Sequence, residues 1–304
     1  MGDRLKDRVA VVTGAGRGIG RGIALLLAHE GAAVVVNDLG GAVDGSGSSS
    51  TPADEVVTTI KNAGGRAIAN ADSVAEFGAA ENIINTAVKE FGRIDILINV
   101  AGILRDRMIF NLSEDDWDAV VKVHLKGTFN CVRHASAHMR QQKFGRIVNF
   151  TSTSGLYGNS GQANYGAAKD GIAGLTRVVS RDLGKYGVTV NAIAPVAATR
   201  MTATVSDQAR ETRAKRGISA GAPASRMRME PEDIAPMVVY LTTDGAKHIN
   251  GQTFLVRGGV ISLLNYPAPA RTITKLGRWS ADEIAAIFPS TFGMDLANPA
   301  PRQD

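Results

Sequence analysis

Three side chains in the middle of the chain have the types and spacing needed to move a proton to or from an alcohol. Tyr165 and Lys169 are four residues apart, so on a helix they lie one turn apart on the same face. Ser152 follows the apolar run Ile147 to Phe150, which is typical of a buried strand. A strand end that leads through a loop into a helix is where open α/β sheets place their chemistry. We therefore expect a site with a hydroxyl, a phenol and an ammonium group.

A tyrosine that acts as a base near neutral pH needs its pKa, near 10 when free, to fall by roughly three, which is worth about 4 kcal/mol. Lys169 would supply positive charge that favours the phenolate. Ser152 would hydrogen-bond the substrate oxygen and stabilise charge that develops there. The spacing of Tyr165 and Lys169 alone also fits an ordinary amphipathic helix. A nucleophilic Ser152 is disfavoured because no GxSxG elbow surrounds it.

The N-terminal segment predicts a dinucleotide-binding turn. An apolar strand at 8–12 runs into TGAGRGIG at 13–20 and then into a helical pattern. In this order, Gly14 permits the tight turn, Gly18 leaves room for a pyrophosphate, and Gly20 lets the helix pack on the sheet. A second strand is followed by Asp38, at the distance expected for an acid that binds the adenosine ribose.

Short apolar strands and amphipathic helices alternate along the rest of the chain. After a glycine- and serine-rich loop at 40–50, the patterns indicate helices at 52–62, 82–91, 113–125 and 128–142 and a helix continuing beyond Tyr165, with strands at 66–70, 94–102, 146–150, 188–195 and 254–256. This alternation predicts a single-domain α/β Rossmann fold: a doubly wound, seven-stranded parallel sheet with helices on both faces and a C-terminal extension.

Composition and charge exclude several classes of protein. The chain has 304 residues, 44% of them hydrophobic, and no apolar run reaches the roughly 20 residues that span a bilayer. The charged N-terminus lacks the apolar segment of a signal peptide, so we expect a cytoplasmic location and no membrane partner. Cys131 is the only cysteine, and His134 with His138 lacks the further ligands of a zinc site, so no metal is expected. The net charge of +5 comes from dispersed basic residues, which favours small anionic ligands over nucleic acid.

These motifs, together with NVAG at 99–102, YGAAK at 165–169 and NAIAP at 191–195, resemble the short-chain dehydrogenase/reductase family. The resemblance implies Ser152, Tyr165 and Lys169 as catalytic residues, with Lys169 also binding the nicotinamide ribose. It implies cofactor contacts at Gly14, Arg17, Gly18, Ile19, Gly20, Asp38, Asp72, Ser73, Asn99, Ala101, Gly102, Tyr165, Lys169 and Pro195.

Two positions depart from the family pattern. His124 stands where most members have an asparagine, and its imidazole would relay protons to water, which makes it a fourth catalytic candidate. Val196 stands where a glycine usually follows the proline, so the turn beside the nicotinamide would have a different backbone shape. The cofactor choice also involves a conflict, because Asp38 favours a free 2′-hydroxyl whereas Arg17 resembles the basic residue of members that prefer NADP. We expect NAD, since one flexible arginine need not offset a carboxylate facing a phosphate.

A narrower resemblance concerns the substrate. NDLGG at 37–41, AGILRDR at 101–107, DDWD at 115–118, VHLKGTF at 123–129 and YGNSGQANY at 157–165 are similar to the (3R)-hydroxyacyl-CoA dehydrogenase part of peroxisomal multifunctional enzyme type 2. This implies an exchange between a (3R)-hydroxyacyl-CoA, including a steroid-derived one, and its 3-oxoacyl-CoA. The alternatives are a hydroxysteroid dehydrogenase, a 3-oxoacyl-carrier-protein reductase and, outside enzymes, a catalytically silent nucleotide-sensing protein.

The resemblance also divides the chain into a dehydrogenase domain at 1–260 and an extension at 261–304. Within the domain, a lid at 199–230 would cover the substrate. Its cations would meet the phosphates of coenzyme A or simply form a solvated helix: Arg200, Arg210, Arg213, Lys215, Arg216, Arg226 and Arg228. In the extension, Ser280 is expected to open a helix at 281–288 that packs over the substrate side or against a neighbouring subunit of a homodimer or homotetramer.

Overall fold

The computed structural model describes residues 2–198 and 229–296, which belong to two compact units. The first unit contains one eight-stranded sheet in the order β3-β2-β1-β4-β5-β6-β7-β8. Its strands are β1 (Val9–Thr13), β2 (Ala33–Asn37), β3 (Arg66–Asn70), β4 (Ile96–Asn99), β5 (Gly145–Phe150), β6 (Val188–Val196), β7 (Thr253–Arg257) and β8 (Val260–Leu263). The predicted doubly wound α/β fold is confirmed.

The prediction of seven parallel strands was one strand short. The strands β1 to β7 pair in parallel, but β8 pairs antiparallel with β7. Arg257 pairs with Val260, so Gly258 and Gly259 form a two-residue hairpin turn, and Gly258 has a positive φ of 46°. Such Gly-Gly turns suit antiparallel hairpins, and this one keeps residues 260–263 in the sheet rather than in the extension.

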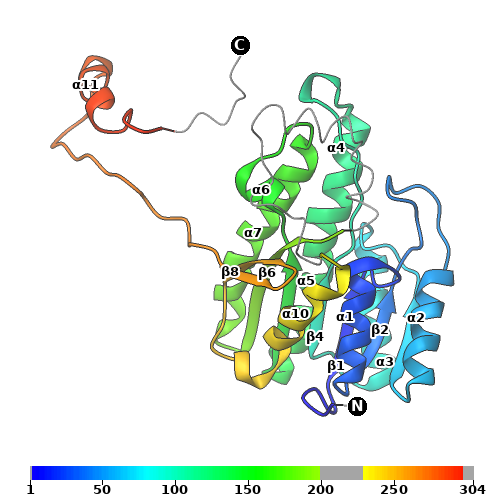
Figure 1. Cartoon of the computed structure of the whole chain (residues 1–304). Coiled ribbons are helices and arrows are strands. Elements are labelled where there is room, and N and C mark those ends of the chain that lie inside the picture. Colours follow the sequence, from blue (N-terminus) through cyan, green and yellow to red (C-terminus); the bar gives the residue numbers. More distant parts are fainter. Residues whose placement is uncertain (1, 199–228, 297–304) are drawn as a thin grey trace. The chain divides into compact units, whose positions relative to one another are not determined.

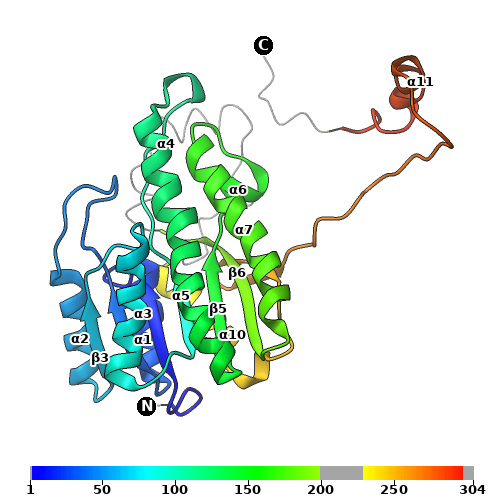
Figure 2. The same cartoon turned by 180° about the vertical axis from the view of Figure 1, so that it is seen from behind.

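Two layers of helices cover the sheet (Figures 1 and 2). One face carries α1 (Gly18–His29), α2 (Thr51–Asn62) and α10 (Ala235–Thr242), and the other carries α3 (Phe77–Phe91), α5 (Gly127–Gln142) and α7 (Ala163–Gly184). The shorter α4 (Glu114–Val121) and α6 (Thr153–Tyr157) lie beyond the carboxyl ends of the strands. The predicted helices include no counterpart of α10, which follows the lid segment.

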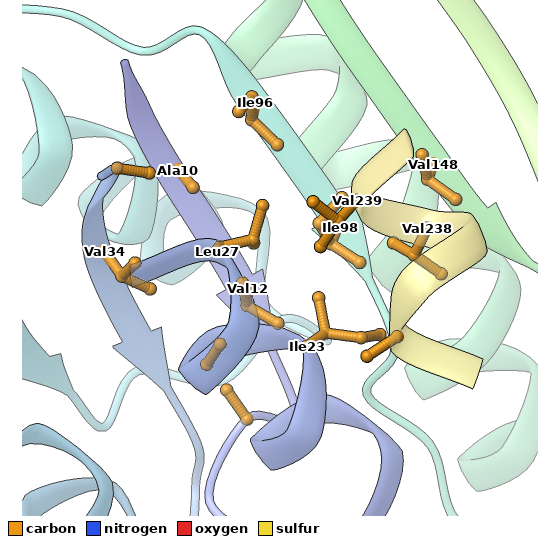
Figure 3. Close-up of a cluster of buried hydrophobic side chains, with 14 of the residues drawn as sticks. Ala10, Val12, Ile23, Leu27, Val34, Ile96, Ile98, Val148, Val238 and Val239 are labelled. Carbon is orange, nitrogen blue, oxygen red and sulfur yellow. The ribbon is translucent and has the colours of Figure 1, made fainter. Parts of the chain in front are cut away.

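Alternate residues of each buried strand supply the two cores. In β1, Ala10 and Val12 pack with Ile23 and Leu27 of α1, as Figure 3 shows, whereas Val9 and Val11 face the opposite layer. A strand that is apolar on both faces is typical of a parallel sheet covered by helices. The strand order reverses between β1 and β4, and at such a switch point the loops diverge and leave a crevice at the carboxyl ends.

The helix that leads to His124 differs from its prediction. Two separate helices were expected at 113–125 and 128–142, but α4 continues into α5 through a π-helical turn at Lys122–Lys126. Ser113, the first residue of the predicted helix at 113–125, caps α4, because its hydroxyl accepts the Asp116 N–H at 3.1 Å. Such single π-turns within α-helices are rare and occur often at functional sites.

The second unit, described over residues 265–296, contains α11 (Ala281–Ile287). Ser280 and Glu283 form a capping box, in which each side chain accepts the other residue's backbone N–H. The helix predicted to start after Ser280 is therefore present. All but the last two positions of the predicted lid lie outside the described residues. Within the described ranges, no helix is both long and apolar enough to cross a bilayer.

Candidate active site

The structure brings Ser152, Tyr165 and Lys169 together where β5 and α7 meet. Ser152 lies two residues beyond β5 and caps α6, where its hydroxyl accepts the Ser154 N–H at 3.1 Å. Tyr165 and Lys169 lie one turn apart on α7, with the lysine Nζ 5.6 Å from the centre of the phenol ring. The three groups predicted from spacing are thus neighbours at the carboxyl end of the sheet.

The pKa values of the phenol and the ammonium are both shifted by burial. Burial raises the pKa of Tyr165 to about 12, with a further rise from the charge of Asp106, while a hydrogen bond with Ser152 opposes the shift. Burial lowers the pKa of Lys169 to about 7. The lysine ammonium donates to the Phe150 carbonyl at 2.6 Å. Burial is the largest cause of the shift at Tyr165, and a lowering of the tyrosine pKa by Lys169 stays a prediction.

His124 lies beside this cluster and is almost completely buried, with 1% of its surface exposed. Its ring meets that of Tyr165 edge to face, with centroids 5.1 Å apart. Its Nε2 lies 2.7 Å from the oxygen and 3.1 Å from the nitrogen of Ile103, so the tautomer decides which of these it bonds. Burial and the charge of Lys169 hold its pKa well below the ordinary value, which keeps the imidazole neutral. This geometry suits an anchored ring better than the expected proton relay to water.

The glycine turn has the backbone geometry that its three predicted positions require. Gly14 has a φ of +64°, and a Cβ there would lie 2.8 Å from the Ala101 Cα. A Cβ at Gly20 would overlap the Gly14 carbonyl oxygen, so the start of α1 packs closely on the turn. Gly18 also has a positive φ, of 52°, yet a Cβ there would meet no atom within 4 Å. Arg17 precedes α1 and is exposed, and Ile19 is its second residue.

Asp38 is fixed just beyond β2. One carboxylate oxygen accepts the Gly16 N–H and the other accepts the Gly40 N–H, both at 2.7 Å. The carboxylate therefore holds the glycine turn against the start of the 40–50 loop. Its remaining lone pairs are available to a further donor, because each carboxylate oxygen accepts more than one hydrogen bond.

Asp72 and Ser73, two of the cofactor contacts that the family resemblance implies, follow β3. Asn70 donates to the Asp72 carboxylate at 2.9 Å, and Asn37 donates both to Asn70 and to the Asp72 carbonyl. This pair of asparagines was not predicted, although the two stand at the ends of adjacent strands. The hydrogen bonds of Asn37 and Asn70 fix the backbone at Asp72, and no single sequence motif indicates this network.

The loop after β4 completes the crevice. Thr13 accepts the N–H groups of Val100 and Ala101 at 3.2 and 3.3 Å, which ties this loop to the glycine turn. Asn99 donates to Asn149 at 2.9 Å, and Gly102 contacts the His124 ring. Pro195 lies within β6, paired with Val256.

Val196 lies at the end of the same strand. It is the last residue of β6, where it pairs with Arg257, so the strand extends one residue beyond its predicted end at Pro195. Among the described residues, no three His, Cys, Asp or Glu side chains gather as a metal site would require. The Nε2 of His134 instead lies 3.1 Å from the Phe77 carbonyl oxygen.

The family model for short chain dehydrogenases matches residues 8–210, which include the glycine turn, Ser152, Tyr165 and Lys169. The chain belongs to the short-chain dehydrogenase family. As an oxidoreductase of this family it shares 40% identity over 297 residues with hydroxyacyl-CoA dehydrogenase ChsB1 of Mycobacterium tuberculosis, covering 95% of this chain and 89% of that protein. It is 44% identical over 264 residues to peroxisomal multifunctional enzyme type 2 of Mus musculus, covering 86% of this chain.

The chain spans only a third of the length of that mouse enzyme, since the match covers 33% of it. It is also 43% identical over 259 residues to a 3-oxoacyl-[acyl-carrier-protein] reductase of Synechocystis, covering 84% of this chain and 98% of that protein. The resemblance to the multifunctional enzyme that the motifs indicated is therefore confirmed. Relatives that act on either kind of acyl carrier are similarly close in sequence.

Proposed function

We propose that this short-chain dehydrogenase is an NAD-dependent oxidoreductase that interconverts a (3R)-hydroxyacyl-CoA and its 3-oxoacyl-CoA. The observation that carries the chemistry is the cluster of Ser152, Tyr165 and Lys169, in which Ser152 lies near enough to the phenol to oppose the rise of its pKa and Lys169 Nζ lies 5.6 Å from the phenol ring centre. The substrate assignment rests on the two relatives whose names or motifs indicate hydroxyacyl-CoA chemistry.

The residues around the crevice fit a nicotinamide dinucleotide. The open space beside Gly18, at the first turn of α1, suits a pyrophosphate, since backbone N–H groups there lack intrahelical partners. The Asp38 carboxylate would hold the adenosine ribose, and Lys169 would hold the nicotinamide ribose. When bound, the nicotinamide supplies or accepts the hydride.

The protein's own residues handle the proton. With a pKa raised to about 12, Tyr165 keeps its proton at neutral pH and can donate it to the oxygen of a ketone during reduction. In the oxidative direction the same oxygen must receive the proton of the alcohol. Ser152 hydrogen-bonds the reacting oxygen in both directions and stabilises its developing charge. Burial of Lys169 places its titration near neutral pH, so its charge varies in the range where the enzyme would work.

The fixed position of Asp38 favours NAD over NADP. Both of its oxygens are held by backbone N–H groups, so the carboxylate cannot turn away from a 2′-phosphate without breaking them. Asp38→Asn should lower the ratio of kcat/KM for NAD to that for NADP by about tenfold, which corresponds to roughly 1.4 kcal/mol. A wild-type preference for NADP would contradict this part of the proposal.

A substrate panel followed by NADH absorbance tests the function. It compares a (3R)-hydroxyacyl-CoA, its (3S) enantiomer, the same acyl group on acyl carrier protein, and a free hydroxysteroid. We expect the highest kcat/KM for the (3R)-CoA ester. A preference for the carrier-protein thioester would instead support a reductase, in line with the Synechocystis relative. Tight NAD binding without turnover of any alcohol would support a nucleotide-sensing protein.

We further propose that the protein is a cytoplasmic homo-oligomer. In each subunit, the segment 199–230 would cover the substrate, and the C-terminal extension would begin near residue 261. The end of the sheet at Leu263 supports the last boundary to within a few residues. Light scattering of the purified protein tests the assembly, and a monomer at micromolar concentration would contradict it. Deleting residues 265–304 should leave a folded protein, because the sheet and its two cores lie before that position.

A further inference from the structure

Two loops that carry the AGILRDR and YGNSGQANY motifs lie against each other where α7 begins. The N–H of Arg107 donates to the Gly161 carbonyl at 2.9 Å, and the Gln162 side chain donates to the Asp106 carboxylate at 2.8 Å. Asn159 in turn donates to Gln162 at 2.7 Å. The proton chemistry described above uses none of these contacts. They nevertheless converge on the turn that carries Tyr165.

Asn164 is the residue at which this network meets the helix. It has no exposed surface, and its Nδ2 donates to the carbonyl oxygens of Arg105 and Asp116, both at 3.0 Å. Its Oδ1 accepts the Tyr165 N–H at 2.8 Å. Both amide hydrogens and the amide oxygen are therefore engaged. One buried side chain thus joins three segments: the loop after β4, the helix α4 and the first turn of α7.

The position of the phenol depends on that first turn. The first N–H groups of a helix have no partner within the helix, and Asn164 satisfies the one that belongs to Tyr165. Ser152 is held separately at the start of α6, and the Lys169 ammonium is held by the Phe150 carbonyl. A displacement of the turn would therefore move the phenol while Ser152 and the lysine ammonium keep their places.

We propose that Asn164 is a positioning residue for Tyr165, which fixes the first turn of α7 on the Arg105 and Asp116 carbonyls so that the phenol meets Ser152. Its kinetic consequence rests on the proposed dehydrogenase function, but its structural consequence does not. The bond between Gln162 and Asp106 is a second tie on the same turn. Because the charge of Asp106 raises the pKa of Tyr165, the packing of the two loops also affects how tightly the phenol holds its proton.

The chain offers an isosteric variant and a matched control. Asn164→Asp keeps the size of the side chain and an acceptor for the Tyr165 N–H, but it places an oxygen without a hydrogen against two carbonyl oxygens. Asn250 uses its amide in the same way at the other end of α7, donating to Ser180 O at 3.0 Å and accepting the Val190 N–H at 2.8 Å. Asn250→Asp therefore disturbs the same helix without touching Tyr165.

We expect Asn164→Asp to lower kcat by about 10- to 100-fold, because small misplacements of a catalytic group have effects of this size. The KM for NAD should stay within about twofold, since the glycine turn and Asp38 are not involved. Asn250→Asp should lower the thermal midpoint by a similar amount yet keep kcat within about twofold. A parallel fall of kcat in both variants would make Asn164 merely structural and overturn the proposal.

A second measurement requires no substrate. The chain has five tyrosines, so ring-¹³C-tyrosine labelling gives few NMR signals, and the loss of one in Tyr165→Phe assigns Tyr165. Asn164→Asp should shift that signal, and Asn250→Asp should leave it in place. If Asn164→Asp does not fold, Asn164→Ser replaces it and retains a hydroxyl acceptor. An unshifted Tyr165 signal in a folded Asn164 variant overturns the inference. If the signal shifts but the wild-type protein turns over no alcohol, the positioning role of Asn164 stands and only the dehydrogenase assignment fails.

Discussion

Replacing Gly102 by alanine tests how rigidly the His124 ring is held. A Cβ at position 102 would overlap the ring Cε1 and lie 2.8 Å from Nδ1. The ring has little freedom to yield, because it is buried, its Nε2 lies 2.7 Å from Ile103 O, and its edge rests on Tyr165. Overpacking costs about 1–3 kcal/mol, and a weakened hydrogen bond adds about 1 kcal/mol. We therefore expect Gly102→Ala to lower the free energy of unfolding by about 2–4 kcal/mol.

The same substitution should behave differently once the ring is removed. The φ of Gly102 is not in the left-handed region, so alanine fits its backbone. In a His124→Ala background, Gly102→Ala should be neutral or stabilising by about 0.4–1 kcal/mol, since it restricts only the unfolded chain. Urea unfolding of the wild type, both single variants and the double variant gives the coupling energy, which we expect to be about 2–5 kcal/mol.

Equal costs of Gly102→Ala in the two backgrounds would refute this reasoning. Such additivity would mean that the His124 ring moves aside freely and does not fix the loop after β4. The free energy of unfolding is the proper measurement, because Gly102 is also a candidate cofactor contact. A change in activity would combine the clash with the His124 ring and an altered cofactor contact.

Four further predictions concern other residues of the first unit. A Cβ at Gly20 would overlap the Gly14 carbonyl oxygen, so Gly20→Ala should abolish NADH binding in a fluorescence titration. A Cβ at Gly78 would meet no atom within 4 Å, so Gly78→Ala should stabilise α3 by about 0.5–1 kcal/mol. Asp95→Asn should cost about 3–5 kcal/mol in urea unfolding, because the buried carboxylate accepts from Arg93 at 2.6 Å and from the Val9 N–H at 3.0 Å. Burial lowers the pKa of Lys169 from 10.5 to about 7, so between these values the unfolded chain binds a proton that the native chain lacks, and stability rises with pH. Lys169→Met should flatten that rise between pH 7 and 10, and an unchanged slope in urea midpoints would contradict a buried, neutral lysine.

The features that were predicted well from the sequence depend on residues close together in the chain. The order of strands and helices follows from apolar runs and turn residues, and the glycine turn follows from three glycines whose spacing has a steric reason. The i, i+4 pair of Tyr165 and Lys169 required only that α7 be a helix. Caps at Ser113 and Ser280 were equally local, because each side chain reaches an N–H three residues away.

The features that sequence did not predict depend on contacts between distant segments. Asn164 is bonded to Arg105, 59 residues away, and without the fold no pattern pairs them. The raised pKa of Tyr165 was not foreseen, because helical spacing shows that Lys169 is near but does not show the burial of the phenol. The eighth strand was missed because it pairs antiparallel in a sheet whose other connections are crossovers.

The π-turn at Lys122–Lys126 has a consequence for how this helix can change. A π-turn accommodates one additional residue in an otherwise α-helical path. Each α-helical residue turns the chain by about 100°, so the side chains of α5 are rotated by that amount relative to an uninterrupted continuation of α4. The apolar stripe therefore changes phase at this point, which is why the sequence suggested two helices. Deleting a single residue within the turn would restore a regular helix, but it would also rotate either the apolar face of α4 or that of α5 away from the core. The backbone phase, rather than any one side chain, is what keeps His124 pointing at Ile103.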